Sequence, residues 1–209
     1  MSADPTHAGH FTDVATQRHA AKLGIWVFIG SEALFFAGLI QLYCAARAVA
    51  PAEFAQGVAH SEKSIGTINT FVLLTSSWFV ALAVDVVRRG RPKLAGLLAA
   101  LTAALGVVFL VLKGVEYAHH VEDGLDPGAV IDPVRGGSAF WTLYWVLTAF
   151  HAAHVVIGTS LLSAFSLRLL WKSKRGGHEQ AFENVTIFWH FVDVVWIFLW
   201  PLFYLTSST

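Results

Sequence analysis

Five long apolar segments dominate this chain, and their length is the strongest constraint on its fold. A helix needs about 20 apolar residues to cross the hydrocarbon core of a bilayer. The sequence meets this requirement in five stretches, residues 23–46, 65–87, 94–115, 139–167 and 185–205. Backbone in lipid must close its own hydrogen bonds, so each stretch is predicted to be a helix. We therefore expect an all-α, polytopic integral membrane protein built as a five-helix transmembrane bundle.

The composition agrees with a membrane protein that has little mass outside the bilayer. Hydrophobic residues make up 56% and charged residues 13% of the chain, whereas a soluble domain carries about 25% charged residues. The formal net charge is zero, which gives no electrostatic reason to expect a nucleic-acid partner. The single cysteine, Cys44, excludes an internal disulfide and any site that needs two thiolates. We expect residues 1–20 to be a cytoplasmic tail and residues 21–209 to be one five-span domain.

The basic residues predict the direction of the spans. Ten Lys and Arg residues fall in the N-terminal tail and in the second and fourth connections, which share one side of the membrane. Three, Arg47, Lys63 and Arg135, fall on the other side. Because cytoplasmic loops carry the excess of Lys and Arg, the N-terminus is predicted to be cytoplasmic and the C-terminus outside.

Five ionisable residues lie inside the predicted spans, at similar depth on three helices: Glu32, His151, His154, His190 and Asp193. A charged group at the centre of a membrane helix costs ~2.5–3.5 kcal/mol on insertion scales, so such residues need a partner or a function. We expect a buried polar network, with Glu32 bonded to His151 or His154 and the fifth helix tied to its neighbours by the other two. The spacing of these five residues is also compatible with two alternatives, a proton or ion path and a metal or haem site.

A second polar group marks the outer end of the third span. Lys113 and Glu116 are spaced to pair on one helix face, and we expect them at the outer interface. Glu116 and His119 also copy the Glu-x-x-His element of di-iron helix bundles. Nearer the cytoplasmic side, Asp85 is expected to pair with the neighbouring arginines. Glu183 precedes the fifth span, and we expect its carboxylate to cap the N-terminus of that helix, where a negative charge is favourable.

Four motifs in order resemble subunit III of the haem–copper oxidases. The stretch 189–196, which reads WHFVDVVW, resembles the last helix of that family. Residues 28–36 resemble its glutamate-bearing helix, the pair Glu116-Tyr117 the end of a later helix, and 150–158 its paired-histidine helix. The resemblance covers residue 21 to the C-terminus and is to the short, five-helix form. Residues 69–77 and 200–205 are also similar to the homologous protein found beside nitric oxide reductases.

The resemblance implies a non-catalytic accessory subunit of a haem–copper terminal oxidase in a bacterial cytoplasmic membrane. Such a subunit stabilises the catalytic subunit I, holds phospholipid and supports proton uptake during aerobic electron transport. It implies no catalytic, cofactor or metal residues in this chain, with haem and copper in partner subunits. The residues agree, because three histidines within the spans and one cysteine are too few for either redox-active subunit.

Other functions remain open from the sequence. The chain could serve a nitric oxide reductase as an accessory subunit. It could instead be a stand-alone membrane metal or haem enzyme that uses His151, His154, His190 and the carboxylates. A proton or ion carrier is less favoured, because no second row of polar residues continues toward the outside.

Overall fold

The computed structural model is helical, without strands, over the residues that it describes: 14–132, 137–171 and 179–206. Five of its helices are long and apolar enough to cross a membrane. They are α1 (Val14–Val49), α3 (Lys63–Arg88), α4 (Pro92–Glu122), α6 (Ala139–Trp171) and α7 (Glu179–Trp200), the last continuing into the π-helical turn η2 (Pro201–Leu205). The prediction of an all-α membrane protein with five spans is confirmed.

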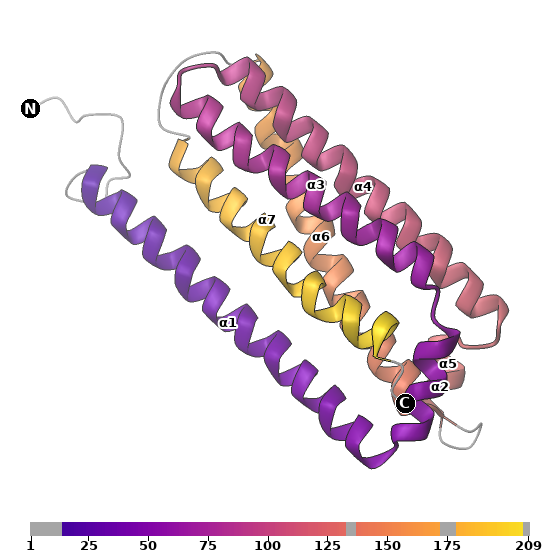
Figure 1. Ribbon diagram of the computed structural model, residues 1–209. Coiled ribbons are helices and arrows are strands. Elements are labelled where there is room, and N and C mark those ends of the chain that lie inside the picture. Colours follow the sequence, from indigo (N-terminus) through magenta and orange to yellow (C-terminus); the bar gives the residue numbers. More distant parts are fainter. Residues whose placement is uncertain (1–13, 133–136, 172–178, 207–209) are drawn as a thin grey trace, which may run out of the picture.

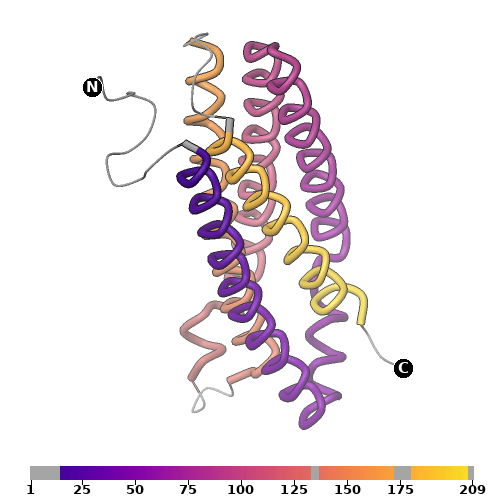
Figure 2. The backbone as a smooth tube through the Cα atoms, turned by 90° about the vertical axis from the view of Figure 1, so that its left-hand side faces the viewer, coloured from indigo at the N-terminus to yellow at the C-terminus, as the bar shows by residue number. Residues whose placement is uncertain are grey.

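Four of the long helices pack closely, and α1 lies against one side of them. Figures 1 and 2 show α3, α4, α6 and α7 side by side, with α1 running along α7 and α6. Only 6% of the most apolar stretch of α1 is buried inside the protein, compared with 50% for the last span. The helix α1 is therefore the least covered of the five.

Two short helices, which were not predicted from the sequence, cover one end of the bundle. These are α2 (Pro51–His60) and α5 (Pro127–Ile131), which Figure 1 places near the C-terminal end. The apolar side chains Phe54 and Val58 bury α2 against the bundle. Gly57 permits this contact, because a Cβ atom there would lie 2.1 Å from the ring of Phe140.

Prolines mark where helices begin. Pro51, Pro92 and Pro127 are the first residues of α2, α4 and α5, a position where the missing N–H has no helical partner to lose. The carboxylate of Asp126 caps α5 by accepting hydrogen bonds from the backbone of Gly128 and Ala129. Pro201 ends the regular α-helix of α7 and begins η2.

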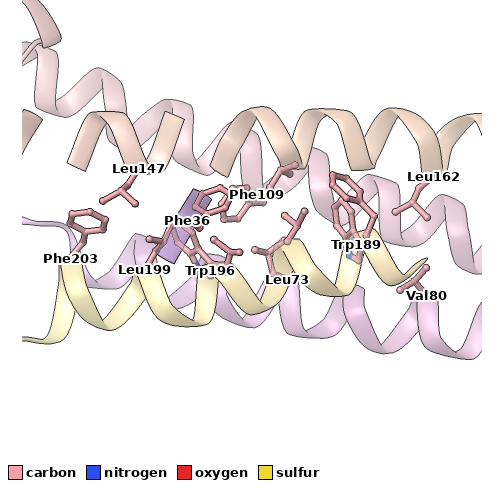
Figure 3. Packing of buried hydrophobic residues seen from close by; sticks show 14 of the residues in the cluster. Phe36, Leu73, Val80, Phe109, Leu147, Leu162, Trp189, Trp196, Leu199 and Phe203 are labelled. Atoms are coloured by element: carbon pink, nitrogen blue, oxygen red, sulfur yellow. The ribbon is translucent and has the colours of Figure 1, made fainter. Parts of the chain in front are cut away.

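Aromatic side chains fill the centre of the bundle. Trp189 and Trp196 are fully buried, and Figure 3 shows Trp196 beside Phe109, with their ring centroids 4.9 Å apart. Their indole N–H groups donate to Ser76 and Thr70 on α3, at 3.0 and 3.1 Å. These two tryptophans are core residues and not the interfacial anchors that the tryptophan pattern of membrane proteins suggests.

Candidate functional site

A cavity lies between α1, α6 and α7, and two of the predicted polar residues, Glu32 and His154, line it. Its volume is about 540 Å³, within the ~300–1,000 Å³ range of small-molecule sites. Eleven side chains line it: Ile25, Phe28, Glu32, Phe35, Phe150, His154, Ile157, Leu161, Asn184, Val185 and Phe188. The wall is thus apolar and aromatic, with three polar side chains.

Glu32 and His154 contact each other in the wall of this cavity. Oε2 of Glu32 lies 3.1 Å from Nε2 of His154, and the two side chains are 23% and 13% exposed. Nδ1 of His154 lies 2.8 Å from the backbone oxygen of Phe150. A carbonyl oxygen only accepts hydrogen bonds, so Nδ1 carries a hydrogen. One further proton is therefore shared between Glu32 and Nε2 of His154.

The local sequence explains how the two helices bring this pair together. Glu32 lies near the midpoint of α1 and His154 near the midpoint of α6. Phe36 follows Glu32 by one turn and packs its ring edge against His154 at 5.2 Å. The neighbouring Phe188 of α7 lies 6.1 Å from the same imidazole. These aromatic contacts hold the imidazole in position over the carboxyl group.

His151 lies in the core of the bundle and not in the cavity. Its ring stacks on Trp196 at 5.1 Å and meets Phe109 edge-on at 5.5 Å. Neither ring nitrogen has a hydrogen-bond partner among the residues that the structure describes. Residues three apart on a helix differ in direction by about 60°, and here that difference separates His151 from the cavity that His154 lines.

His190 and Asp193 lie on the contact between α7 and α3. Nδ1 of His190 is 2.7 Å from the hydroxyl oxygen of Ser77. Asp193 is 4% exposed, with Ser77 as a polar neighbour, but its carboxyl oxygens make no hydrogen bond of good geometry within the described part of the chain. The five residues expected to form one network are therefore divided among the cavity, the core and the α3–α7 contact.

Lys113 and Glu116 form the best-satisfied polar cluster in the described residues. Nζ of Lys113 donates to Oε2 of Glu116 at 3.1 Å, and to the hydroxyl groups of Tyr144 and Tyr204 at 2.8 and 2.9 Å. Both tyrosines in turn donate to Oε1 of Glu116, at 2.7 and 2.6 Å. The structure encloses both side chains of this predicted pair within the bundle, and their position at the outer interface stays a prediction.

Aromatic rings surround the Lys113 ammonium group. It lies 4.5 Å from the ring centroid of Tyr144 and between 5.1 and 5.6 Å from those of Tyr117, Trp196 and Tyr204. The tyrosines of this cluster are not among the residues predicted from the sequence. A signal was present, because the chain has four tyrosines and all of them lie in the long helical spans.

Glu116 and His119 do not form a metal-binding element. Glu116 points into the core, whereas His119 is exposed and bonds to Glu62 at 2.5 Å. In the part of the chain that the structure describes, no group of three His, Cys, Asp or Glu side chains is placed to share one ion.

Two ion pairs lie at the end of the bundle where α3 ends and α7 begins. Asp85 pairs with Arg89 at 2.9 Å, as the spacing indicated. Glu183 accepts from Arg88 at 2.9 and 3.0 Å. Glu183 therefore joins α7 to the end of α3. The predicted interaction was with the N-terminus of its own helix.

Comparison with known proteins gives matches that span nearly the whole chain. The family model described as cytochrome c oxidase subunit III matches residues 1–208. Cytochrome c oxidase subunit 3 of Synechocystis sp. is 33% identical over 87% of this chain and 74% of that protein. Quinol oxidase subunit 3 of Bacillus spizizenii is 31% identical over 95% of this chain and 96% of that protein. Cytochrome c oxidase subunit 3 of Corynebacterium diphtheriae is 34% identical, with 88% and 86% covered.

Proposed function

This chain belongs to the cytochrome c oxidase subunit III family and is an accessory subunit of a haem–copper oxidase, and from that premise we propose that it stabilises the catalytic subunit I and supports proton uptake. Electron transfer and oxygen reduction then take place on haem and copper held by partner subunits. Residues 21–209 act in this proposal as one domain, with residues 1–20 as a cytoplasmic tail.

One observation carries this proposal: the intramembrane polar side chains form hydrogen bonds with one another inside the bundle. Glu32 bonds to His154, Ser77 to His190, and Lys113 to Glu116 and two tyrosines. The first two contacts join α1 to α6 and α3 to α7, and the third group joins α4 to α6 and η2. These residues therefore stabilise the packing of the bundle. Interhelical hydrogen bonds in membranes contribute on average ~0.6 kcal/mol each, and several of them fix one packing arrangement.

The proposed setting is a bacterial cytoplasmic membrane, with the N-terminus cytoplasmic and the C-terminus outside. The distribution of Lys and Arg supports this direction. Arg88 and Arg89 lie at the same end of the bundle as the start of α7, to which Arg88 is bonded. That end is therefore proposed to face the cytoplasm, where proton uptake begins.

Bound phospholipid is part of the proposal and is assigned to the outer side of α1. Leu23, Trp26, Val27 and Leu34 are exposed there, and they offer acyl chains an apolar surface. Arg18 and Lys22 lie near the first turns of the same helix and are also exposed. Basic side chains near the end of a membrane helix attract anionic lipid headgroups.

The test is purification of the complex from native membranes in mild detergent, with a visible spectrum and metal analysis before and after the partner subunits are removed. We expect haem and copper to co-purify with the chain and then to leave with other polypeptides. The haem types of those partners would help to narrow the terminal acceptor and the electron donor. Stoichiometric metal or haem retained by the stripped chain would contradict the proposal.

Variants of two intramembrane carboxylates refine this test. Glu32→Ala or Asp193→Ala is expected to lower the stability of the complex or its sustained turnover, while the haem spectrum is kept. Both residues would then act through packing and proton supply. Complete loss of haem in either variant would contradict the proposal.

A further inference from the structure

We propose that the cavity between α1, α6 and α7 binds a membrane quinol, with a ring hydroxyl donating to Oε1 of Glu32. The site goes beyond the accessory role, since it gives this chain a small-molecule ligand of its own. Four features of the cavity lead to this class: its charge, the direction of its free hydrogen bond, its aromatic wall and its depth.

The lining residues include no cationic side chain, which disfavours binding of a phosphate headgroup. None of the eleven lining side chains is Lys or Arg, and Glu32 and His154 are the ionisable ones. Phosphate is bound in proteins by cationic side chains or by free backbone N–H groups. An apolar pocket with a few convergent polar groups fits an uncharged ligand whose polar atoms are few.

The hydrogen bonds already made within the pair fix what the ligand must supply. Nδ1 of His154 is used by Phe150, and Nε2 is used by Oε2 of Glu32. With the shared proton on Nε2, Glu32 is a carboxylate. With that proton on Oε2, the remaining Oε1 is a carbonyl oxygen. In both cases Oε1 accepts a hydrogen bond, so a ligand that bonds to this carboxyl group must donate one. A quinol has such a hydroxyl, and the oxidised quinone does not.

The wall suits a flat ring. Phe28, Phe35 and Phe150 are partly exposed and line the cavity together with Phe188. Phe35 and Phe150 meet edge to face with centroids 5.0 Å apart, and Phe28 and Phe188 lie 6.0 Å apart. Aromatic rings prefer such offset and edge-on neighbours over simple stacking, and a quinol ring can join this arrangement.

The depth of the pair favours a ligand that resides within the hydrocarbon. Glu32 and His154 lie near the midpoints of their long helices. The hydrocarbon core is ~30 Å thick, so the middle of a span is ~15 Å from the headgroups of either leaflet. A phospholipid headgroup does not lie at this depth, whereas the ring of an isoprenoid quinol can reach it from within the bilayer.

The test measures binding of defined probes to the purified full chain by native mass spectrometry in detergent. The probes are decylubiquinol kept reduced under argon, decylubiquinone, dioleoylglycerol and dioleoylphosphatidylglycerol. We expect one decylubiquinol per chain, bound about tenfold more tightly than decylubiquinone, which is the factor that a single hydrogen bond supplies. Equal binding of the two redox forms, or dioleoylglycerol binding as tightly as decylubiquinol, would overturn the proposal.

Matched variants identify Glu32 as the acceptor. Glu32→Gln can donate its amide to Nε2 of His154 and still present a carbonyl oxygen, so it should keep the preference for the quinol. Glu32→Leu should abolish that preference, while Glu122→Leu, an exposed position outside the cavity, should leave it unchanged. A preference that persists in Glu32→Leu would overturn the assignment.

A second variant, Ile157→Trp, tests the cavity independently, in case Glu32→Leu does not fold. Ile157→Trp enlarges a side chain of the cavity wall without changing the polar pair, and should weaken binding of both redox forms. Co-purification with the haem-bearing subunits is followed separately in every variant. A chain that joins the complex but does not prefer the quinol contradicts this inference and leaves the accessory role standing.

Discussion

Lys113 and Glu116 form an ion pair of 3.1 Å that is almost completely enclosed, with side chains 2% and 0% exposed. The pair lies on one face of α4, and the tyrosines that complete it come from α6 and η2. Removing two charges from water is costly, and it is repaid only when the remaining donors and acceptors are satisfied. Here both carboxylate oxygens and the ammonium group have partners, so the cluster fixes how α4, α6 and η2 meet.

Glu116→Gln should strongly destabilise the chain, because it leaves the ammonium group of Lys113 buried without a counter-charge. Breaking a buried ion pair from one side costs ~3–5 kcal/mol. The same range is expected for Lys113→Met. The measurement is unfolding of the full chain in detergent, followed by tryptophan fluorescence, which should respond because Trp196 adjoins the cluster.

The double variant Lys113→Met with Glu116→Leu tests whether the loss comes from an unpaired charge. It should recover a large part of the stability lost in either single variant, but not all of it, because Tyr144 and Tyr204 lose their acceptor. Lys63→Met, at an exposed position on α3, serves as a control. Single variants that unfold like the unmodified chain would mean that the pair contributes nothing to packing.

Gly106→Ala should destabilise the core contact between α4, α6 and α7. A Cβ atom at Gly106 would lie 2.4 Å from Oγ1 of Thr159 and 2.8 Å from the ring of Trp189. Overpacking a tight core costs ~1–3 kcal/mol. The control is Gly114→Ala on the same helix, where nothing lies within 4 Å and where alanine should gain up to ~1 kcal/mol in helix propensity. Equal stabilities of the two variants in the same unfolding assay would count against this packing.

The five spans could be predicted from sequence because the length of an apolar segment is a local property. The end helices α2 and α5 could not, since helices of this length are marginal alone and depend on tertiary packing. For α2, that packing is the burial of Phe54 and the approach of Gly57 to Phe140. Such contacts join segments that are distant in the chain, and no local pattern records them.

The polar residues were predicted in part, because their depth can be read from the sequence but their direction cannot. Depth and spacing anticipated the bonds of Glu32 with His154 and of Lys113 with Glu116. The separation of His151 from His154 depends on the rotation of α6 against its neighbours. The role of Tyr144 and Tyr204 depends on helices far apart in sequence that meet at Glu116.

Arg88→Ala should change stability only slightly. The guanidinium group donates twice to one oxygen of Glu183, but its side chain is 61% exposed. Exposed ion pairs contribute ~0.2–1 kcal/mol and are screened by salt. The difference between Arg88→Ala and the unmodified chain should therefore shrink when unfolding is repeated at high ionic strength. Arg91→Ala, from the same connection, is the control, and a loss that salt does not reduce would show that Arg88 acts through packing.

Asp193→Leu should separate the stability of the chain from the activity of the complex. The carboxyl group is buried in the α3–α7 contact, and its oxygens make no hydrogen bond of good geometry with the residues described. A buried polar group without partners costs ~1–3 kcal/mol, so an apolar side chain of similar size should not lower the stability of the isolated chain.

An ionisable residue inside a membrane is first considered as a functional residue, so sustained turnover of the complex should fall in the same variant. Ser77→Ala, which removes the neighbouring hydroxyl, is the companion variant. Asp193→Leu that lowers stability and leaves turnover intact would make Asp193 a packing residue, and its carboxyl group would then have no part in proton supply.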